Sequence, residues 1–255
     1  SPVDLFPSRV VARNAYPDRK PDVQVCCPKC GDIFRSQNAE STVDCRRCGF
    51  RFDPKDFEIV EVEVRVKSSR LPEAFDGYRI AQLSDIHYGQ WVTAERLGGI
   101  VELTNRQRPD LIAITGDFVS YSPDSTEEIA PILERLCPRD RTLAVLGNHD
   151  HWLGAGMVRS FLKAAGIVDI SNGPSRVERL GARVYFLGID SAMLGKDRLD
   201  QALATLPPGA AAVLLAHEPD FAETSSKTER FILQVSGHSH GGQCVIPYLG
   251  TPFRG

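Results

Sequence analysis

The sequence has no long hydrophobic run, no excess of positive charge and no histidine before position 87. No apolar stretch approaches the ~20 residues of a membrane-spanning helix. The net charge of −3 gives no electrostatic reason to expect a nucleic-acid partner. A hydrophobic content of 42% with 25% charged residues is typical of a folded globular chain and argues against disorder. The 255 residues allow one large α/β domain with a small appendage.

The N-terminal residues carry no visible secretory signal, but the chain begins Ser1-Pro2 without a Met. The sequence therefore says nothing about an upstream segment that processing removes. Residues 1–22 contain four prolines and little periodicity, which predicts an extended arm.

Five of the seven cysteines lie between positions 26 and 48, and four of them form two C-x-x-C-G motifs, with fourteen residues between Cys30 and Cys45. Paired thiolates on tight turns are typical of a tetrahedral zinc site, although this spacing is slightly shorter than usual. We predict a zinc-ribbon module over residues 23–56, with one structural zinc; a pair of disulfides is the alternative. Its expected ligands are Cys27, Cys30, Cys45 and Cys48. Cys26 is a spare thiol, and Cys137 and Cys244 are expected to be small buried apolar residues.

The remainder, residues 57–255, alternates strand-like and helix-like patterns. Alternation of apolar and charged residues predicts a half-buried strand over 57–67. Further strands are expected at 78–83, 111–115, 142–146, 168–170, 176–179, 183–188, 211–216 and 231–235. Helices are expected at 94–107, with Thr93 as N-cap, and at 127–136, 156–165 and 199–205. This order predicts a layered α/β sandwich flanked by helices.

All six histidines directly follow an apolar strand, and oxygen ligands share their loops. Asp85 and His87, one residue apart, would point to the same side of an extended backbone. Since ligands gather at the carboxyl ends of strands in α/β sheets, these side chains should converge. Imidazole nitrogens mixed with carboxylate oxygens suit Mn, Fe or Zn better than Mg or Ca. The pattern predicts two neighbouring divalent ions bridged by a carboxylate.

Five blocks in this order resemble the calcineurin-like metallophosphoesterase family: Asp85-Ile-His87, Gly116-Asp117, Gly147-Asn148-His149-Asp150, His217 and Gly237-His238-Ser-His240. Within it, Leu83-Ser-Asp-Ile-His87-Tyr-Gly and Ser236-Gly-His-Ser-His240-Gly-Gly-Gln243 resemble bacterial YkuE/YaeI-type phosphodiesterases. The resemblance covers residues 57–250. Residues 24–52 resemble the zinc-ribbon family.

The resemblance implies a role for each matching residue. Asp85, His87 and His240 would hold the first metal, Asn148, His217 and His238 the second, and Asp117 would bridge them. His149 would face the scissile phosphate, with Asp150 orienting its ring, and a metal-bridging hydroxide would attack phosphorus. No role follows for His151, which is expected behind the ligands or at the surface. Family members usually continue with further strands, so we expect the C-terminus at Gly255 to be truncated.

The predicted function is a dinuclear metal-dependent phosphoesterase, acting on a phosphodiester. One alternative is a pyrophosphatase for a lipid-linked substrate of the UDP-diacylglucosamine type, with Trp91, Val92, Trp152 and Leu153 lining an acyl groove; this implies contact with a membrane surface. Another is a non-catalytic protein that docks a partner of unknown identity through the zinc ribbon. Thiolate motifs favour a reducing compartment, so we expect a cytoplasmic protein.

Overall fold

The computed structural model describes residues 62–89, 92–120 and 125–240, together with short segments between residues 23 and 52. Cys27, Cys30, Cys45 and Cys48 lie outside the described residues, as do Trp91, Gln243 and Cys244. None of the helices in the described residues combines the length and apolar character that a bilayer crossing requires.

The chain forms two compact units, one of Val66–His238 and one that contains Ser1–Arg65 and Ser239–Gly255. The second unit includes two short antiparallel hairpins, β1 (Val23–Cys26) with β2 (Ile33–Ser36), and β3 (Val43–Asp44) with β4 (Arg51–Phe52). The predicted division at residues 22/23 and 56/57 stays a prediction.

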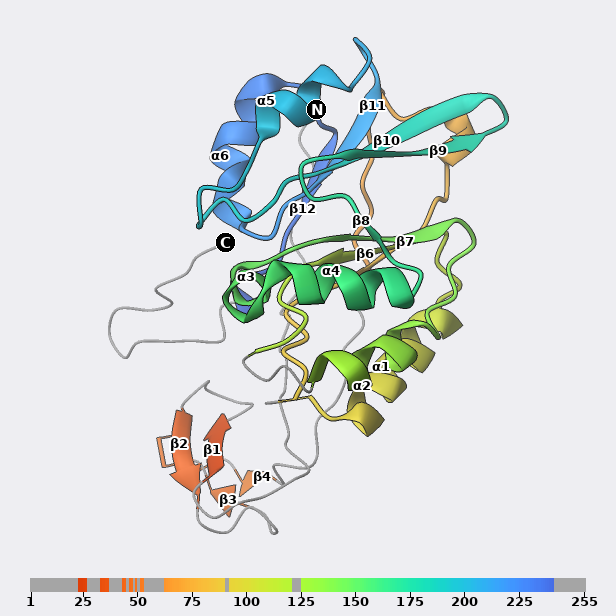
Figure 1. The fold of residues 1–255 in the computed structure, drawn as a ribbon. Helices are drawn as coiled ribbons and strands as arrows, with labels where there is room; N and C mark the ends of the chain where they lie inside the picture. Colours follow the sequence, from red (N-terminus) through yellow and green to blue (C-terminus); the bar gives the residue numbers. More distant parts are fainter. Residues whose placement is uncertain are drawn as a thin grey trace. The chain divides into compact units, whose positions relative to one another are not determined.

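The first sheet of the Val66–His238 unit is parallel and has the order β5-β6-β7-β8. Its strands are β5 (Ile80–Leu83), β6 (Leu111–Thr115), β7 (Arg141–Val145) and β8 (Val168–Asp169). Along one side lie α1 (Ala94–Arg106), α2 (Ser125–Leu133) and α4 (Ala155–Ala164) (Figure 1). Thr93 caps α1 as expected, since its side chain accepts a hydrogen bond from the Arg96 amide.

The second sheet has the order β12-β11-β10-β9 and ends in an antiparallel hairpin. Its strands are β9 (Pro174–Arg179), β10 (Ala182–Gly188), β11 (Ala211–Leu215) and β12 (Leu233–Val235). On the outer side lie α5 (Leu199–Ala204) and α6 (Ala222–Ser225), with the short 3₁₀ turns Pro219–Phe221 and Ser226–Thr228 on either side of α6. A further 3₁₀ turn, Glu73–Phe75, precedes β5.

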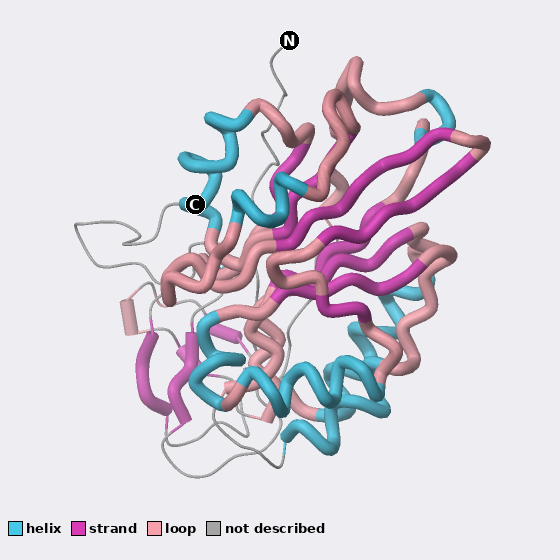
Figure 2. The backbone as a smooth tube through the Cα atoms, turned by 45° about the horizontal axis from the view of Figure 1, so that its top comes forward, coloured by secondary structure: helices cyan, strands magenta, loops and turns pink. Residues whose placement is uncertain are grey.

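The two sheets stack on each other with helices outside, as predicted (Figure 2). Strand β6 shows why its residues form this arrangement. Leu111 and Ala113 pack into the cluster between the sheets, and Ile112 and Ile114 pack into the cluster beneath the helices. Alternate residues of a strand face opposite sides of the sheet. A strand with an uninterrupted apolar run can therefore be buried on both faces. Strand β11 repeats the pattern between the inter-sheet cluster and the one around α5.

Two local predictions are wrong. The strand expected over 57–67 is absent from its described part, 62–67, where Val62 is 43% and Val64 51% exposed. Alternation alone does not make a strand, because the backbone also needs a neighbouring strand to bond, and no described strand pairs with these residues. Cys137 is exposed rather than buried, since it lies in the turn after α2 where the chain runs over the surface.

Candidate active site

Asp117, in the loop after β6, lies at the centre of the converging side chains. It is 1% exposed, and its carboxylate oxygen Oδ2 lies 3.2 Å from His217 Nε2 and 3.7 Å from His87 Nε2. The other oxygen, Oδ1, accepts a 2.9 Å hydrogen bond from the His149 amide. One oxygen of Asp117 therefore faces histidines from two different strand ends.

The first group of ligand atoms surrounds His217, which follows β11. Its Nε2 lies 3.2 Å from Asn148 Oδ1, from Asp117 Oδ2 and from His238 Nδ1. The Nδ1 atom of the same ring lies 2.7 Å from the Thr115 carbonyl oxygen, to which it donates. When the ring is neutral, that bond leaves the lone pair on Nε2, which is the form a metal ligand needs.

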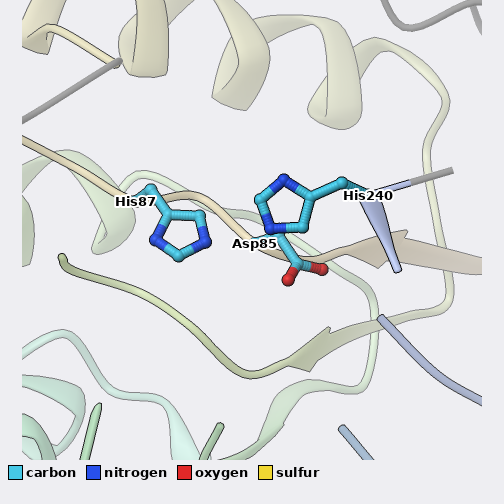
Figure 3. A group of neighbouring side chains, drawn as sticks. All are labelled: Asp85, His87 and His240. Atoms are coloured by element: carbon cyan, nitrogen blue, oxygen red, sulfur yellow. The ribbon is translucent and has the colours of Figure 1, made fainter. Parts of the chain in front are cut away.

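The second group contains Asp85, His87 and His240, whose ligand atoms all lie within 4.8 Å of one another. Figure 3 shows the His87 and His240 rings with the Asp85 carboxylate beside them. Ser120 Oγ lies 3.1 Å from His87 Nδ1, so Nε2 faces Asp117. A third combination with suitable spacing is His87, Asp117 and His149.

The candidate ligands are held by backbone that ordinary residues rarely adopt. Nine non-glycine residues of the described chain have positive φ, and five of them are candidate ligands. These are Asp85, His87, Asp117, His238 and His240, with φ between 46° and 65°. Our expectation that Asp85 and His87 share a face of an extended strand is therefore wrong, because both lie in the left-handed region. Such conformations cost on the order of 1–3 kcal/mol each and concentrate at functional sites.

The charges of the site are strongly coupled. Burial opposes ionisation of Asp117, but the imidazoles of His217, His87 and His149 outweigh it and hold the pKa of this carboxyl below its usual value. Burial likewise opposes protonation of His217, yet the Asp117 carboxylate raises the pKa of His217 to about 9. Without a cation, a proton on His217 supplies the positive charge beside Asp117. A divalent cation would replace that proton.

Asp150 anchors the backbone around Asp117, and its predicted role in orienting the His149 ring stays a prediction. Its buried carboxylate accepts hydrogen bonds from the backbone amides of Asp117, Phe118 and Gly147, each 2.9 Å long. These bonds fix the Asp117 loop against the start of α3 (Asn148–Leu153), and they use both carboxylate oxygens. Burial, followed by the charge of Asp117, raises the pKa of Asp150 to about 7, against the effect of the three amides.

His149 and Trp152 lie on α3, a helix where the sequence predicted a loop. The His149 ring lies between His87, 4.7 Å away between ring centroids, and Trp152, 4.5 Å away. Trp152 is 52% exposed. His149 therefore combines a fixed position beside the metal-competent group with a neighbour that is open to solvent.

All seven side chains predicted to hold the two catalytic metals lie in the described residues, and six of them occur in the metal-competent groups. Asn148 joins them through its 3.2 Å contact with His217. Imidazole nitrogens, carboxylate oxygens and one amide oxygen form a donor set that fits divalent transition metals.

Sequence reasoning missed the residues behind the ligands. Thr115 and Ser120 orient histidines, and neither belongs to a recognisable motif. Asp190 and Glu218 are buried carboxylates beside the site, and Glu218 follows His217 directly. For Glu218, the position next to the predicted ligand His217 was the one sequence signal that pointed to the site. His151 lies behind the ligands, with Nε2 2.5 Å from Asp190 Oδ1.

The calcineurin-like phosphoesterase family model matches residues 78–242. The chain is 34% identical over 197 residues to the uncharacterized metallophosphoesterase YkuE of Bacillus subtilis, covering 75% of this chain and 68% of that protein. It is 32% identical over 214 residues to a transmembrane protein with metallophosphoesterase domain of Danio rerio, covering 77% and 48%. It is 30% identical over 181 residues to phosphodiesterase YaeI of Escherichia coli, covering 69% and 65%.

The chain spans roughly half to two thirds of the length of these curated relatives. The family match covers more than half of this chain and includes every converging loop described above. Shared sequence and converging ligands lead to one conclusion: the chain belongs to the calcineurin-like phosphoesterase family and is a metallophosphoesterase.

Proposed function

We propose that this chain hydrolyses phosphodiesters with two divalent cations bound on either side of the Asp117 carboxylate. The observation that carries the proposal is the position of Asp117 Oδ2 between His217 Nε2 and His87 Nε2. Asp85, His87 and His240 would hold one cation, and Asn148, His217 and His238 the other, with Asp117 shared. The mixture of nitrogen and oxygen donors favours Mn, Fe or Zn.

Bound cations of this kind polarise phosphoryl oxygens and allow water to ionise near neutral pH. The residues of the chain then have distinct tasks. Asp117 stays ionised because the surrounding imidazoles lower its pKa. His149, fixed on α3 between His87 and Trp152, offers its ring as a hydrogen-bond donor to the leaving oxygen. The relative named phosphodiesterase YaeI supports a diester as the substrate.

The test is hydrolysis of bis(p-nitrophenyl) phosphate by the full chain, with added Mn²⁺ and after chelation. Asp117→Asn should lower kcat/KM by more than about 100-fold, because loss of a mere hydrogen-bond partner of a ligand already costs about 10–100-fold and Asp117 is the proposed shared ligand. The exposed Asp76→Asn is the matched control and should leave activity unchanged. Hydrolysis that survives both chelation and Asp117→Asn would refute the proposal.

A lipid-linked pyrophosphate is the weaker candidate substrate. Of the side chains expected to line an acyl groove, Val92 and Leu153 pack against the core under the helices. Trp152 is half exposed, and Trp91 lies outside the described residues. The described part of the chain therefore supplies one of the four groove residues. Comparison of kcat/KM on the lipid and on a soluble diester separates the two candidates.

The structural zinc is a separate proposal. The sequence places Cys27 and Cys30 between strands β1 and β2, and Cys45 and Cys48 between β3 and β4. A C-x-x-C within the connection of each hairpin supports a shared tetrahedral site. Elemental analysis of the full chain should give one zinc per chain that Cys30→Ser removes. Zinc retained by that variant would contradict the proposal. The expected reducing compartment remains a prediction from these thiols.

A further inference from the structure

Asp190 and Glu218 are two buried carboxylates that the proposed chemistry does not use. Each is 6% exposed, and neither belongs to a metal-competent group in the described part of the chain. A buried carboxylate is unfavourable unless hydrogen bonds compensate for its lost hydration. Their partners therefore indicate why the chain keeps them.

Asp190 follows β10 and connects the second sheet to α3. Its Oδ1 lies 2.5 Å from His151 Nε2 and accepts a 2.8 Å bond from the Ser191 amide. Its Oδ2 accepts a 3.2 Å bond from Arg159 Nη2 on α4. The His151 and Asp190 side chains are 9% and 8% exposed, so this contact is shielded from water. Helix α3, which begins with Asn148, is thereby tied to the end of β10.

Glu218 ties the same loop to the end of β11. Its Oε1 accepts bonds from Ser191 Oγ at 2.5 Å and from the Met193 amide at 3.2 Å. Its Oε2 accepts a 3.0 Å bond from the Ala192 amide. Three donors occupy the carboxylate. Glu218 therefore fixes residues 191–193 by hydrogen bonds and is not a metal ligand. The residue before Glu218 is His217.

These bonds form one path between two candidate ligands on different sheets. It runs from α3 through His151 to Asp190, then through Ser191 to Glu218 and the adjacent His217. Asn148 follows β7 of the first sheet and His217 follows β11 of the second, yet Asn148 Oδ1 lies 3.2 Å from His217 Nε2. We propose that Asp190 and Glu218 are positioning residues that hold Asn148 and His217 at ligand distance from each other.

This inference rests on the proposed function. It predicts that Asp190 and Glu218 affect the binding of only one of the two proposed cations. Asp85 and His87 have supports that do not pass through Asp190 or Glu218: Ser120 Oγ lies 3.1 Å from His87 Nδ1, and the Asp85 carboxylate accepts the His238 backbone amide at 2.9 and 3.1 Å. Loss of the Asp190–Glu218 path should therefore weaken the cation near Asn148 and His217 and spare the one near Asp85 and His87.

The experiment measures the two stepwise Mn²⁺ dissociation constants of the metal-free full chain by electron paramagnetic resonance and calorimetry. His151→Leu removes the donor to Asp190, and Glu218→Gln places an amide N–H₂ against backbone N–H groups. Each should weaken one Mn²⁺ site about 10–100-fold and leave the other unchanged. Asn148→Ala, which removes a ligand directly, identifies the affected site.

Two further variants keep the result specific. His151→Gln retains a side-chain donor toward Asp190 and should restore most of the lost affinity. Glu178→Gln makes the same chemical change as Glu218→Gln at an exposed ion pair with Arg183 and should change nothing. Thermal unfolding of the metal-free variants reports general damage to the fold.

Unchanged affinities at both sites in His151→Leu and Glu218→Gln would overturn this inference while leaving the proposed function intact. Equal weakening of both sites, with a lower unfolding temperature, would also overturn it, because the residues would then support the fold in general. A wild-type chain that binds no pair of Mn²⁺ ions would overturn the proposed function and this inference together.

Discussion

Gly147 lies where a side chain has no room. A Cβ atom there would meet Asp117 Oδ1, and it would lie 2.8 Å from both Asp117 N and His217 Cε1. The glycine therefore allows α3 to begin directly against two candidate ligands. Its neighbour Gly116 has a similar constraint, with Gly147 N and His217 Nδ1 each 2.6 Å from the position of a Cβ atom.

Gly147→Ala should consequently displace Asp117 and His217 and abolish paired Mn²⁺ binding. The change is one methyl group, so the loss is due to geometry rather than to removal of a ligand. Metal titration of the purified variant measures it. Gly99→Ala, in the exposed part of α1 with open space around it, is the control and should stabilise the helix by about 1 kcal/mol. Normal Mn²⁺ binding by Gly147→Ala would contradict the site geometry.

The role of His149 can be distinguished from that of a metal ligand by measuring both the reaction rate and metal binding. If its ring acts as donor to the leaving oxygen, His149→Ala should lower kcat about 10²–10³-fold and leave both Mn²⁺ affinities unchanged. The relevant measurements are kcat on an aryl phosphodiester and metal titration of the same preparation. His149 also has ligand spacing with His87 and Asp117. A lost Mn²⁺ site in this variant would make it a ligand instead.

Site residues were predicted well where a side chain that can bind metal also lies at the end of a predicted strand. Histidines confined to strand ends identify the loops of the site, because the ends of neighbouring strands must meet. Asp190 has no such signal, since its partners His151 and Arg159 lie on helices distant in sequence. Only the folded chain brings these side chains together.

At the scale of elements, continuous apolar runs were the reliable signal. Strand β6 matches its predicted range because burial on both faces favours a continuous apolar run, here Leu111 to Ile114. Helix α3 was missed because Asn148–Leu153 carries site residues instead of an apolar stripe. Its start depends on Gly147 as N-cap and on Asp150, which accepts the Gly147 amide. Residues 62–67 show the opposite error: their alternating pattern predicts a strand, but no described strand pairs with them.

Helix α1 offers a direct test of a predicted cap. Thr93 Oγ1 accepts the Arg96 amide at 3.3 Å, and the helix buries Leu97 and Val101 against the first sheet. Thr93→Ala should lower the free energy of unfolding by about 1 kcal/mol, measured by urea denaturation. Thr93→Ser keeps the acceptor oxygen and should retain most of that stability. Equal losses in the two variants would show that the side-chain methyl group, and not the cap, is responsible.

At the scale of the whole molecule, pairing of the sheets sets where the site can form. Gln82 Nε2 on β5 donates to the Ser236 carbonyl after β12 at 2.6 Å, and His217 after β11 donates to the Thr115 carbonyl of β6. Both bonds join one sheet to the other at their carboxyl ends. Sequence reasoning predicted two stacked layers, but which strands meet across them depends on contacts between residues far apart in the chain.

Stability of the metal-free protein should depend on pH through His217. Its pKa is raised from 6.5 to about 9 by Asp117, so folding favours the protonated ring. This contribution is fully present below about pH 6.5 and is lost as pH rises to about 9. The raised pKa of Asp150 also makes stability fall as pH rises, but that contribution is lost by about pH 7. Urea midpoints should therefore fall between pH 7 and 9.

Saturating Mn²⁺ should remove that decline, because the cation takes the place of the proton on His217. Calorimetry in buffers of different ionisation enthalpy should record proton release on metal binding below pH 9. A metal-free midpoint that rises between pH 7 and 9 would contradict the proposed charge coupling.

The central claim is that separate loops from two sheets bind a pair of cations around one carboxylate. Anomalous diffraction from crystals of the full chain grown with Mn²⁺ tests it most directly. We predict two peaks flanking Asp117, one beside Asp85 and His87 and one beside Asn148 and His217. A single peak, or peaks remote from Asp117, would contradict it.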